Sequence, residues 1–126
     1  MNTDKQIIQI GNVCPTKNRD NPNQGRVYDP SGISPSLNCK GGGNLEPHII
    51  DESLRCRKYT PLECFRLMGF TDEDFFKVKN ALIETFYNGR DRANSQLYKL
   101  AGNSISVSML EFIFCQMFDD ENEIWV

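Results

Sequence analysis

The sequence has 126 residues, of which 39% are hydrophobic and 25% are charged, and its formal net charge is −3. This length suits one modest domain with one core, and the composition is ordinary for a globular protein. No run of about 18 apolar residues occurs, so the sequence predicts no transmembrane helix. The first residues, MNTDKQIIQIGN, also lack the long apolar core of a signal peptide.

The five cysteines do not form a recognisable framework. They are scattered over positions 14, 39, 56, 64 and 115 without a Cys-x-x-Cys pair, and His48 is the single histidine. This pattern disfavours a disulfide scaffold and a zinc cluster, so we expect no metal site. Such cysteine use fits a reducing, intracellular setting best.

Charge is distributed unevenly along the chain. Residues 1–68 carry nine Lys or Arg and seven Asp or Glu, whereas residues 69–126 carry five and ten. The overall acidity argues mildly against a nucleic-acid partner. However, affinity for phosphate depends on the local face that meets it rather than on the total charge.

The first part of the chain predicts short strands separated by long loops. Residues 7–11, 26–29 and 46–50 have the apolar or alternating patterns of strands. The two connecting stretches, 12–25 and 30–43, are rich in the Asn, Pro, Gly and Ser residues that favour turns. Loops of this length in a small domain more often carry function than serve as filler.

From residue 60 onward the sequence predicts helices. Thr60, Pro61 and Glu63 form a capping box with proline at the first helical position, and Gly69 ends that helix. Thr71 or Asp72 can cap a second helix that runs to about residue 86. Its apolar residues recur every three or four positions, which predicts a core face formed by Phe75, Val78, Leu82 and Phe86.

Two further helices complete the prediction. Residues 95–102, SQLYKLAG, predict a short helix that is closed by Gly102. Ser106 or Ser108 can cap a last helix that runs to about Phe118. We therefore expect an α+β chain, with a loop-rich β part over residues 1–52 and a helical part over residues 53–126.

Three segments, in this order, resemble one protein family. RKYTPLECFRLMGF (57–70) is similar to the next-to-last motif of DNA cytosine-5 methyltransferases, and SQLYKLAGNSISVSMLEFI (95–113) is similar to their last motif. NQGRVYDPSGISPSLNCKGGG (23–43) resembles the end of their target recognition domain. Each segment alone is moderately specific, and their order and spacing together carry the resemblance over roughly residues 6–118.

The family's catalytic motifs do not occur in this sequence. It has no proline-cysteine dipeptide for attack on cytosine, no Glu-Asn-Val segment, no glycine-rich loop after a first strand and no Gln-Arg-Arg segment. Cys14-Pro15 has the dipeptide reversed. The resemblance is therefore to the C-terminal third of such an enzyme, whose helical part would pack on a Rossmann-like catalytic domain absent from this chain. Without the nucleophile, we expect no methyl transfer by this chain alone.

The last motif implies a cofactor contact. By resemblance, Gly102, Asn103 and Ser104 would form the turn that faces the methionine end of S-adenosylmethionine. Glycine permits a tight backbone, and a hydroxyl with backbone N–H groups at a helix start suits a carboxylate. From the residues alone, the same tripeptide also fits a glycine that ends one helix, followed by the cap of the next.

The recognition segment implies contacts with double-stranded DNA, from which the family flips the target cytosine. By resemblance, Gln24 can fill the space left by the flipped base, and Arg26 lies near a base-reading arginine. Lys17 and Arg19 would meet phosphates. Asn-Pro-Asn-Gln-Gly could equally be a solvated turn.

A second loop, residues 34–43, completes this implied interface. Ser36 stands where the family usually has a threonine near the phosphate of the flipped nucleotide. Gly41, Gly42 and Gly43 would let the backbone approach DNA closely. No Gly-Lys-Ser/Thr follows them, so this is not a nucleotide-triphosphate loop.

A polar cluster lies near the predicted junction of the two parts, formed by Arg57, Thr60, Glu63 and Arg66. We expect Arg57 and Arg66 to brace the recognition part against a structural hinge, with surface salt bridges as the alternative. The last helix carries an apolar face of Leu110, Ile113, Phe114 and Met117, which would be exposed without a large domain and so predicts an interface.

Two functional hypotheses follow. The chain could be the DNA-recognition and cofactor-wall portion of a DNA (cytosine-5) methyltransferase, with a separate catalytic subunit or domain, in a bacterial or phage-like, restriction-modification setting. Alternatively, it could be a non-catalytic DNA-binding or interaction protein, a truncated remnant that self-associates through the last helix. A third possibility is that the chain is a piece of a longer enzyme.

Overall fold

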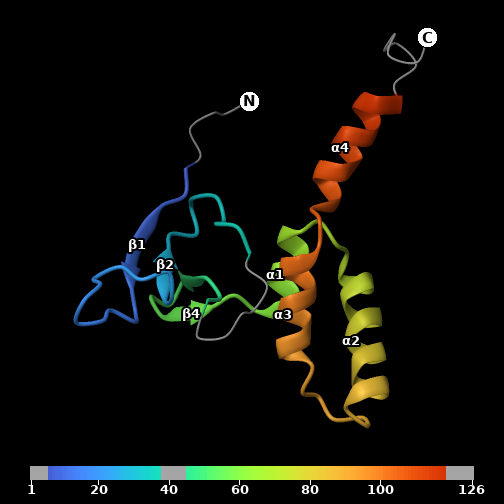
Figure 1. The fold of residues 1–126 in the computed structure, drawn as a ribbon, viewed down its shortest axis with the longest axis horizontal. Helices are drawn as coiled ribbons and strands as arrows, with labels where there is room; N and C mark the ends of the chain where they lie inside the picture. The colour runs from blue at the N-terminus through green and yellow to red at the C-terminus, as the bar shows by residue number, and fades with distance from the viewer. Residues whose placement is uncertain (1–5, 38–44, 119–126) are drawn as a thin grey trace.

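A computed structural model describes residues 6–37 and 45–118, which form one four-stranded sheet followed by helices (Figure 1). The α+β prediction is confirmed for this part of the chain. In chain order the elements are β1 (Gln9–Asn12), β2 (Arg26–Tyr28), β3 (His48–Ile50), β4 (Cys56–Lys58), α1 (Pro61–Leu67), α2 (Asp72–Phe86), α3 (Asn94–Asn103) and α4 (Val107–Phe118).

The sheet has the order β1-β2-β3-β4, with a parallel β2–β3 pair between two antiparallel pairs. Its central strands bury Val27 and Ile49. The predicted strands at 26–29 and 46–50 are confirmed. The strand predicted at 7–11 begins two residues later, and the apolar residues around it, including Ile7 and Ile10, are exposed.

The sequence analysis missed β4. Its three residues, Cys-Arg-Lys, lack an apolar alternation, and the strand forms through pairing with β3 rather than through its own pattern. Because β4 ends at Lys58, the sheet extends past residue 52, where we placed the division between the two parts. That division stays a prediction.

The starts of α1 and α2, predicted from capping signals, are confirmed. Thr60 and Thr71 both cap their helices, and each forms a capping box with the acidic residue three positions later, Glu63 and Asp74. Gly69 follows α1 with φ +86°, the left-handed conformation that favours glycine.

The helical core lies between α1, α2 and α3 and contains Cys64, Phe65, Phe75, Ala93, Leu97 and Ala101. The Phe65 and Phe75 rings pack edge to face with centroids 5.2 Å apart. The prediction that Phe86 belongs to this core is wrong, because its side chain is 72% exposed. Phe86 ends the fifteen-residue α2, which extends far beyond the seven-residue α1 that covers Phe75.

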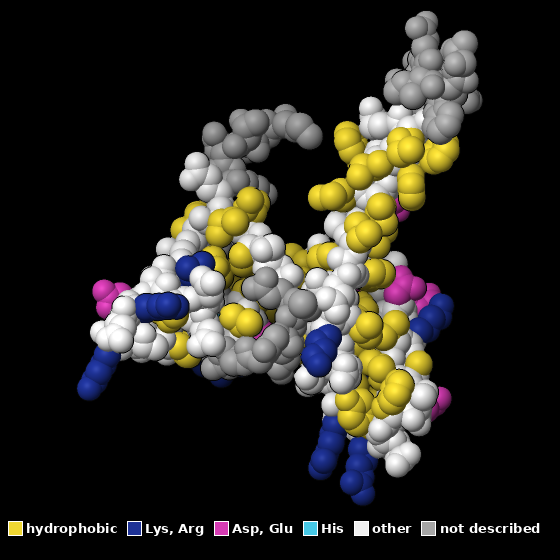
Figure 2. Space-filling model, in the orientation of Figure 1, with side chains coloured by type: hydrophobic (Ala, Val, Ile, Leu, Met, Phe, Trp, Pro, Cys, Tyr) yellow, Lys and Arg dark blue, Asp and Glu magenta, His cyan; other side chains and the backbone are white. Residues whose placement is uncertain are grey.

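The last helix, α4, projects away from the rest of the fold (Figure 1). None of its residues is buried, and hydrophobic side chains cover it in Figure 2. Among the described residues, no helix has the length and apolar character needed to cross a membrane.

Candidate nucleic-acid interface and cofactor turn

The first predicted recognition loop is a structured extension of the β1–β2 hairpin. The Val13 N–H donates to the Gly25 carbonyl at 2.8 Å and closes its base. Two backbone hydrogen bonds between Thr16 and Arg19, of 3.0 and 3.2 Å, form a tight turn at its tip. Lys17 lies in this turn, and both Lys17 and Arg19 are exposed, so their charges are accessible to phosphate groups.

Gly25 fixes the backbone between the two predicted base-contacting residues. It is buried, with φ +70°, and a Cβ added to it would lie 2.9 Å from both Cβ and Sγ of Cys14. Gln24 before it is exposed, whereas Arg26 after it is half-buried on β2. The Nε atom of Arg26 is buried and finds no hydrogen-bond partner among the described residues.

The structure brings residues of both predicted loops to neighbouring hollows. One hollow, of about 400 Å³, is lined by residues that include Arg26 and Ser36. A second, of about 600 Å³, is lined by residues that include Arg19 and Gln24. Asn23 and Leu45 line both hollows, so the two hollows lie next to each other on one face. Gly41, Gly42 and Gly43 lie outside the described residues.

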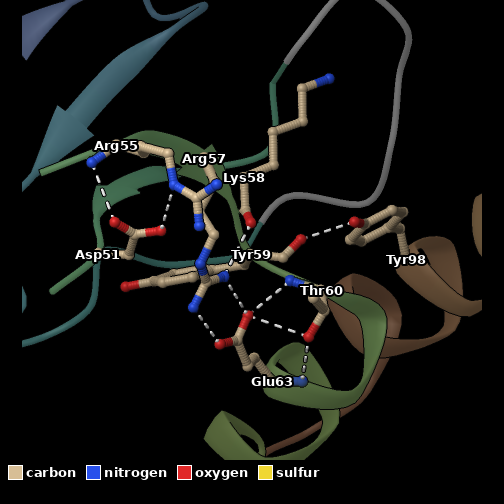
Figure 3. Close-up of polar contacts among 8 residues, drawn as sticks. All are labelled: Asp51, Arg55, Arg57, Lys58, Tyr59, Thr60, Glu63 and Tyr98. Carbon is tan, nitrogen blue, oxygen red and sulfur yellow. Dashed lines mark hydrogen bonds and ion pairs between the residues drawn. The ribbon is translucent and has the colours of Figure 1, made fainter. Parts of the chain in front are cut away.

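The Glu63 carboxylate joins the sheet to the helices (Figure 3). Its two oxygens accept hydrogen bonds from the Arg57 guanidinium of β4, at 2.8 and 2.9 Å. One of them also accepts the Thr60 N–H at 2.7 Å. The Arg57 guanidinium, with help from Thr60, lowers the pKa of Glu63 to about 2.

The other members of the predicted hinge cluster lie as follows. The Thr60 hydroxyl donates to Glu63 at 3.0 Å and accepts the Glu63 N–H. Arg66 forms a bidentate pair with Asp72 at 2.6 and 2.7 Å, so it joins α1 to α2 rather than contacting the sheet. The bracing role assigned to Arg66 stays a prediction.

The predicted cofactor turn differs in its backbone from the expectation. Gly102 does not end α3, because the helix continues through it to Asn103, and its φ is not positive. Ser104 ends the helix instead: its N–H donates to the Leu100 carbonyl at 3.0 Å and its hydroxyl to the Ala101 carbonyl at 2.7 Å. The reason is that a serine in extended conformation can satisfy the terminal carbonyls without a left-handed glycine.

The turn is tied to the first helix. The Val107 N–H donates to the Met68 carbonyl at 2.9 Å, and Gly69 lies against Val107 and Ser108, where an added Cβ would approach to 3.1–3.3 Å. Ser104 also borders an apolar hollow of about 610 Å³ lined by Phe65, Phe70, Asp74, Lys77, Val78, Leu100 and Val107. Asn103 is exposed beside it.

The described residues offer no metal cluster, and the buried thiol of Cys64 is not activated. Within residues 6–37 and 45–118, no group of three His, Cys, Asp or Glu side chains could hold a metal ion. Cys64 is buried, and this burial raises its pKa to about 12, so the thiol stays protonated at neutral pH.

Sequence reasoning missed the amide side chains that support the first loop. Asn21 hydrogen-bonds to both Gln9 and Asn12, and Asn12 also donates to the Pro22 carbonyl of the loop backbone. The turn-rich composition indicated only that a loop exists. The position of Asn12 at the end of a strand and the start of that loop was the one available signal.

Comparisons with known proteins agree on one family. A model of C-5 cytosine-specific DNA methylases matches residues 2–119. The orphan methyltransferase M.SPBetaI of Bacillus phage SPbeta is 34% identical over 138 residues, which cover 73% of this chain and 29% of that protein. M.SPRI, an orphan methyltransferase of Bacillus phage SPR, is 52% identical over 63 residues, covering 50% of this chain and 12% of that protein. The type II methyltransferase M.HhaI of Haemophilus parahaemolyticus is 31% identical over 91 residues, covering 70% and 23%. The chain therefore spans less than a third of the length of each of these relatives.

The contact between Gly25 and Cys14 predicts that Gly25→Ala destabilises the fold. Gly89→Ala is a matched control, because Gly89 has φ +80° but nothing within 4 Å of an added Cβ. Backbone strain alone should cost about 1 kcal/mol at either site, and the clash should add about 1–3 kcal/mol at Gly25. Urea unfolding of both variants measures this difference, and equal destabilisation would refute the steric role of Cys14.

The Glu63 pair predicts acid sensitivity. Because the folded-state pKa of Glu63 is lowered from 4.5 to about 2, its stabilising contribution is complete above pH 4.5 and is lost as pH falls toward 2. The difference in unfolding free energy between wild type and Glu63→Gln should shrink over that interval. Glu73→Gln, which alters an exposed carboxylate paired with Lys77, is the control and should give a much smaller effect.

Proposed function

The chain belongs to the C-5 cytosine-specific DNA methylase family, and we propose that it is the DNA-recognition and cofactor-wall portion of a DNA (cytosine-5) methyltransferase. A catalytic part outside this sequence would supply the nucleophile and most contacts to S-adenosylmethionine. The observation that carries the proposal is the face on which Arg19, Gln24, Arg26 and Ser36 gather around shared residues. A bacterial or phage setting, inside the cell, fits the relatives.

The chemistry of this face suits duplex DNA. Lys17 and Arg19 present exposed charges at a rigid tip, which position a protein on the phosphate backbone without reading sequence. Arg26 is half-buried and lines the first hollow, and guanidinium groups bind guanine O6 and N7. The exposed amide of Gln24 can replace hydrogen bonds that an extruded base leaves behind.

The turn after α3 suits the methionine end of S-adenosylmethionine. The Ser104 hydroxyl keeps acceptor capacity while it donates to Ala101, and the Asn103 amide can both donate and accept. These groups match an ammonium and a carboxylate, so the residues fit the cofactor. When bound, S-adenosylmethionine supplies an electrophilic methyl group, and this chain's contribution is to hold the ammonium and carboxylate of its methionine end.

The proposal assigns the chemical step to the missing part. Attack on cytosine needs a thiolate beside the flipped base. Cys64 is buried and protonated, and Cys14, although next to a proline, lies against Gly25 at the base of the first loop. Neither meets that requirement, so we expect the chain alone to be inactive.

The apolar surface of α4 gives the catalytic part a place to bind. Four side chains of α4 are at least half exposed: Met109, Phe112, Phe114 and Phe118. Among the described rings, Phe114 packs against Phe118 of the same helix. A contiguous apolar patch of this kind is typical of an interface. Pairing of two copies through α4 is the alternative use of the same surface.

One observation favours the second function, a non-catalytic DNA-binding remnant. The Ser104 hydroxyl already caps α3, so the sequence of the turn is explained without a cofactor. In this second function, the chain binds DNA through the same face but works without a catalytic part.

We predict that methyl transfer separates the two functions. The tagged chain, recovered from its native source, should carry methyltransferase activity only together with a polypeptide that contains a proline-cysteine site, and the purified chain should show none. Activity of the purified chain would refute the division of labour. A lone, inactive chain that still binds DNA would support the remnant.

The charged tip predicts a change in salt dependence. Lys17→Ala and Arg19→Ala should weaken binding to all duplexes and each reduce the slope of log affinity against log salt concentration by about 1, because each removes about one phosphate contact. Lys77→Ala on α2, far from the loop in sequence, is the control and should leave the slope unchanged. Unaltered slopes in both loop variants would place the phosphate contacts elsewhere.

A further inference from the structure

Asn12 lies where β1 ends and the recognition loop begins. Its side chain is half-buried, and its backbone pairs with Arg26 on β2. The residue is therefore directly opposite one predicted base-contacting residue and at the root of the loop that carries another, Gln24. None of the family-derived roles described above involves it.

The Asn12 amide spans the loop from its first turn to its last. Its Oδ1 accepts the Cys14 N–H at 2.7 Å, and its Nδ2 donates to the Pro22 carbonyl at 2.9 Å. The same Nδ2 lies 3.2 Å from Oδ1 of Asn21. One side chain thus ties the segment leaving β1 to the segment that returns through Pro22 toward Gln24.

A second amide reinforces the same point. Gln9 and Asn21 form a reciprocal pair, with Nε2 of Gln9 donating at 2.6 Å and Nδ2 of Asn21 donating back at 3.2 Å. These groups are exposed, so each bond contributes little alone. The Asn12 bonds to Cys14 and Pro22 are partly buried, so losing them costs more than losing an exposed bond.

The loop has no apolar core of its own that could replace these bonds. Its described residues between 15 and 24 are all exposed except Pro22, and its turn at Thr16 and Arg19 holds only the tip. The segment from Pro22 to Gln24 therefore depends on Asn12 on one side and on the left-handed Gly25 on the other. Removing Asn12 frees the backbone that aims Gln24 but leaves the charges of the tip in place.

We propose that Asn12 is a positioning residue for DNA reading, which sets sequence discrimination by holding the Pro22–Gln24 segment and does not contact DNA itself. This proposal rests on the proposed function. A direct DNA contact would change two properties together, the preference among base sequences and the dependence of binding on salt. A positioning residue should change only the first.

The test measures binding of the full chain to duplexes selected by that chain from a randomised library, and to the unselected library. Asn12→Ala should reduce the preference for selected duplexes about tenfold, the scale of one well-placed base contact, while the salt slope stays that of wild type. Amide hydrogen exchange should show faster exchange at Val13 and Cys14 but unchanged protection in α1 and α3, which excludes global unfolding. Asn80→Ala, at an exposed position on α2, is the matched control.

A double-mutant cycle gives the second readout. If Asn12 acts through the placement of Gln24, then Asn12→Ala should cause little further loss of discrimination when Gln24 is already alanine. Asn12→Asp keeps the acceptor for Cys14 but sets a carboxylate oxygen against the Pro22 carbonyl, so it should lose discrimination while the bond to Cys14 remains. It also serves as the test protein if the alanine variant does not fold.

The outcomes are distinct. The positioning role is overturned if Asn12→Ala loosens the loop but keeps the wild-type preference among duplexes. It is also overturned if the loss of discrimination in Asn12→Ala adds fully to the loss in Gln24→Ala. Either result leaves the proposed function intact. A reduced salt slope in Asn12→Ala would overturn the positioning role too, because it would indicate a phosphate contact. A wild-type chain that prefers no duplex would overturn the proposed function and, with it, this inference.

Discussion

The bidentate pair between Arg57 and Glu63 is the constraint on which the relation between sheet and helices depends. Arg57 belongs to the edge strand β4, and Glu63 belongs to the first turn of α1. The same carboxylate completes the capping box at Thr60, so one side chain both caps the start of the helix and links the helix to the sheet. A half-exposed ion pair alone would contribute little, but here four hydrogen bonds share one acceptor group.

A second contact acts on the same short connection. The Tyr98 hydroxyl of α3 donates to the Tyr59 carbonyl at 2.6 Å, between β4 and α1 (Figure 3). The strand that leaves the sheet is thus held by α1 on one side and by α3 on the other. The loops proposed to face DNA and the turn after α3 are far apart in sequence, and these two contacts help to fix one against the other. A recognition part and a cofactor wall can act in one enzyme only if their separation is constant.

The elements that could be predicted are those whose determinants are local. Both capping boxes, the glycine after α1 and the central strands follow from residues within a few positions of one another. What escaped prediction depends on partners distant in sequence. Strand β4 has no apolar pattern and exists because β3 pairs with it. Phe86 has the right spacing for the core, but α1 is too short to cover it.

In the candidate site, too, features with local determinants could be predicted and features with distant partners could not. The family resemblance located the loops and the turn, because motifs are carried by sequence. The residue pattern, by contrast, misplaced the end of α3, which runs through Gly102 to Asn103 and is closed by hydrogen bonds from Ser104 to Leu100 and Ala101. It also could not identify Asn12, whose partners are brought to it only when the loop folds back.

The same reasoning applies to α4, the element with the least structural support in the described chain. Its twelve residues have high mean hydrophobic character and bury none of their side chains, so its apolar surface costs free energy in water. Its start is nevertheless fixed, because Val107 is hydrogen-bonded to Met68 and packed on Gly69. A helix that is anchored at one end and apolar along its exposed length is stabilised by whatever surface covers it. For a chain that spans less than a third of the length of its relatives, we propose that this helix is the surface that the remainder of an enzyme would cover.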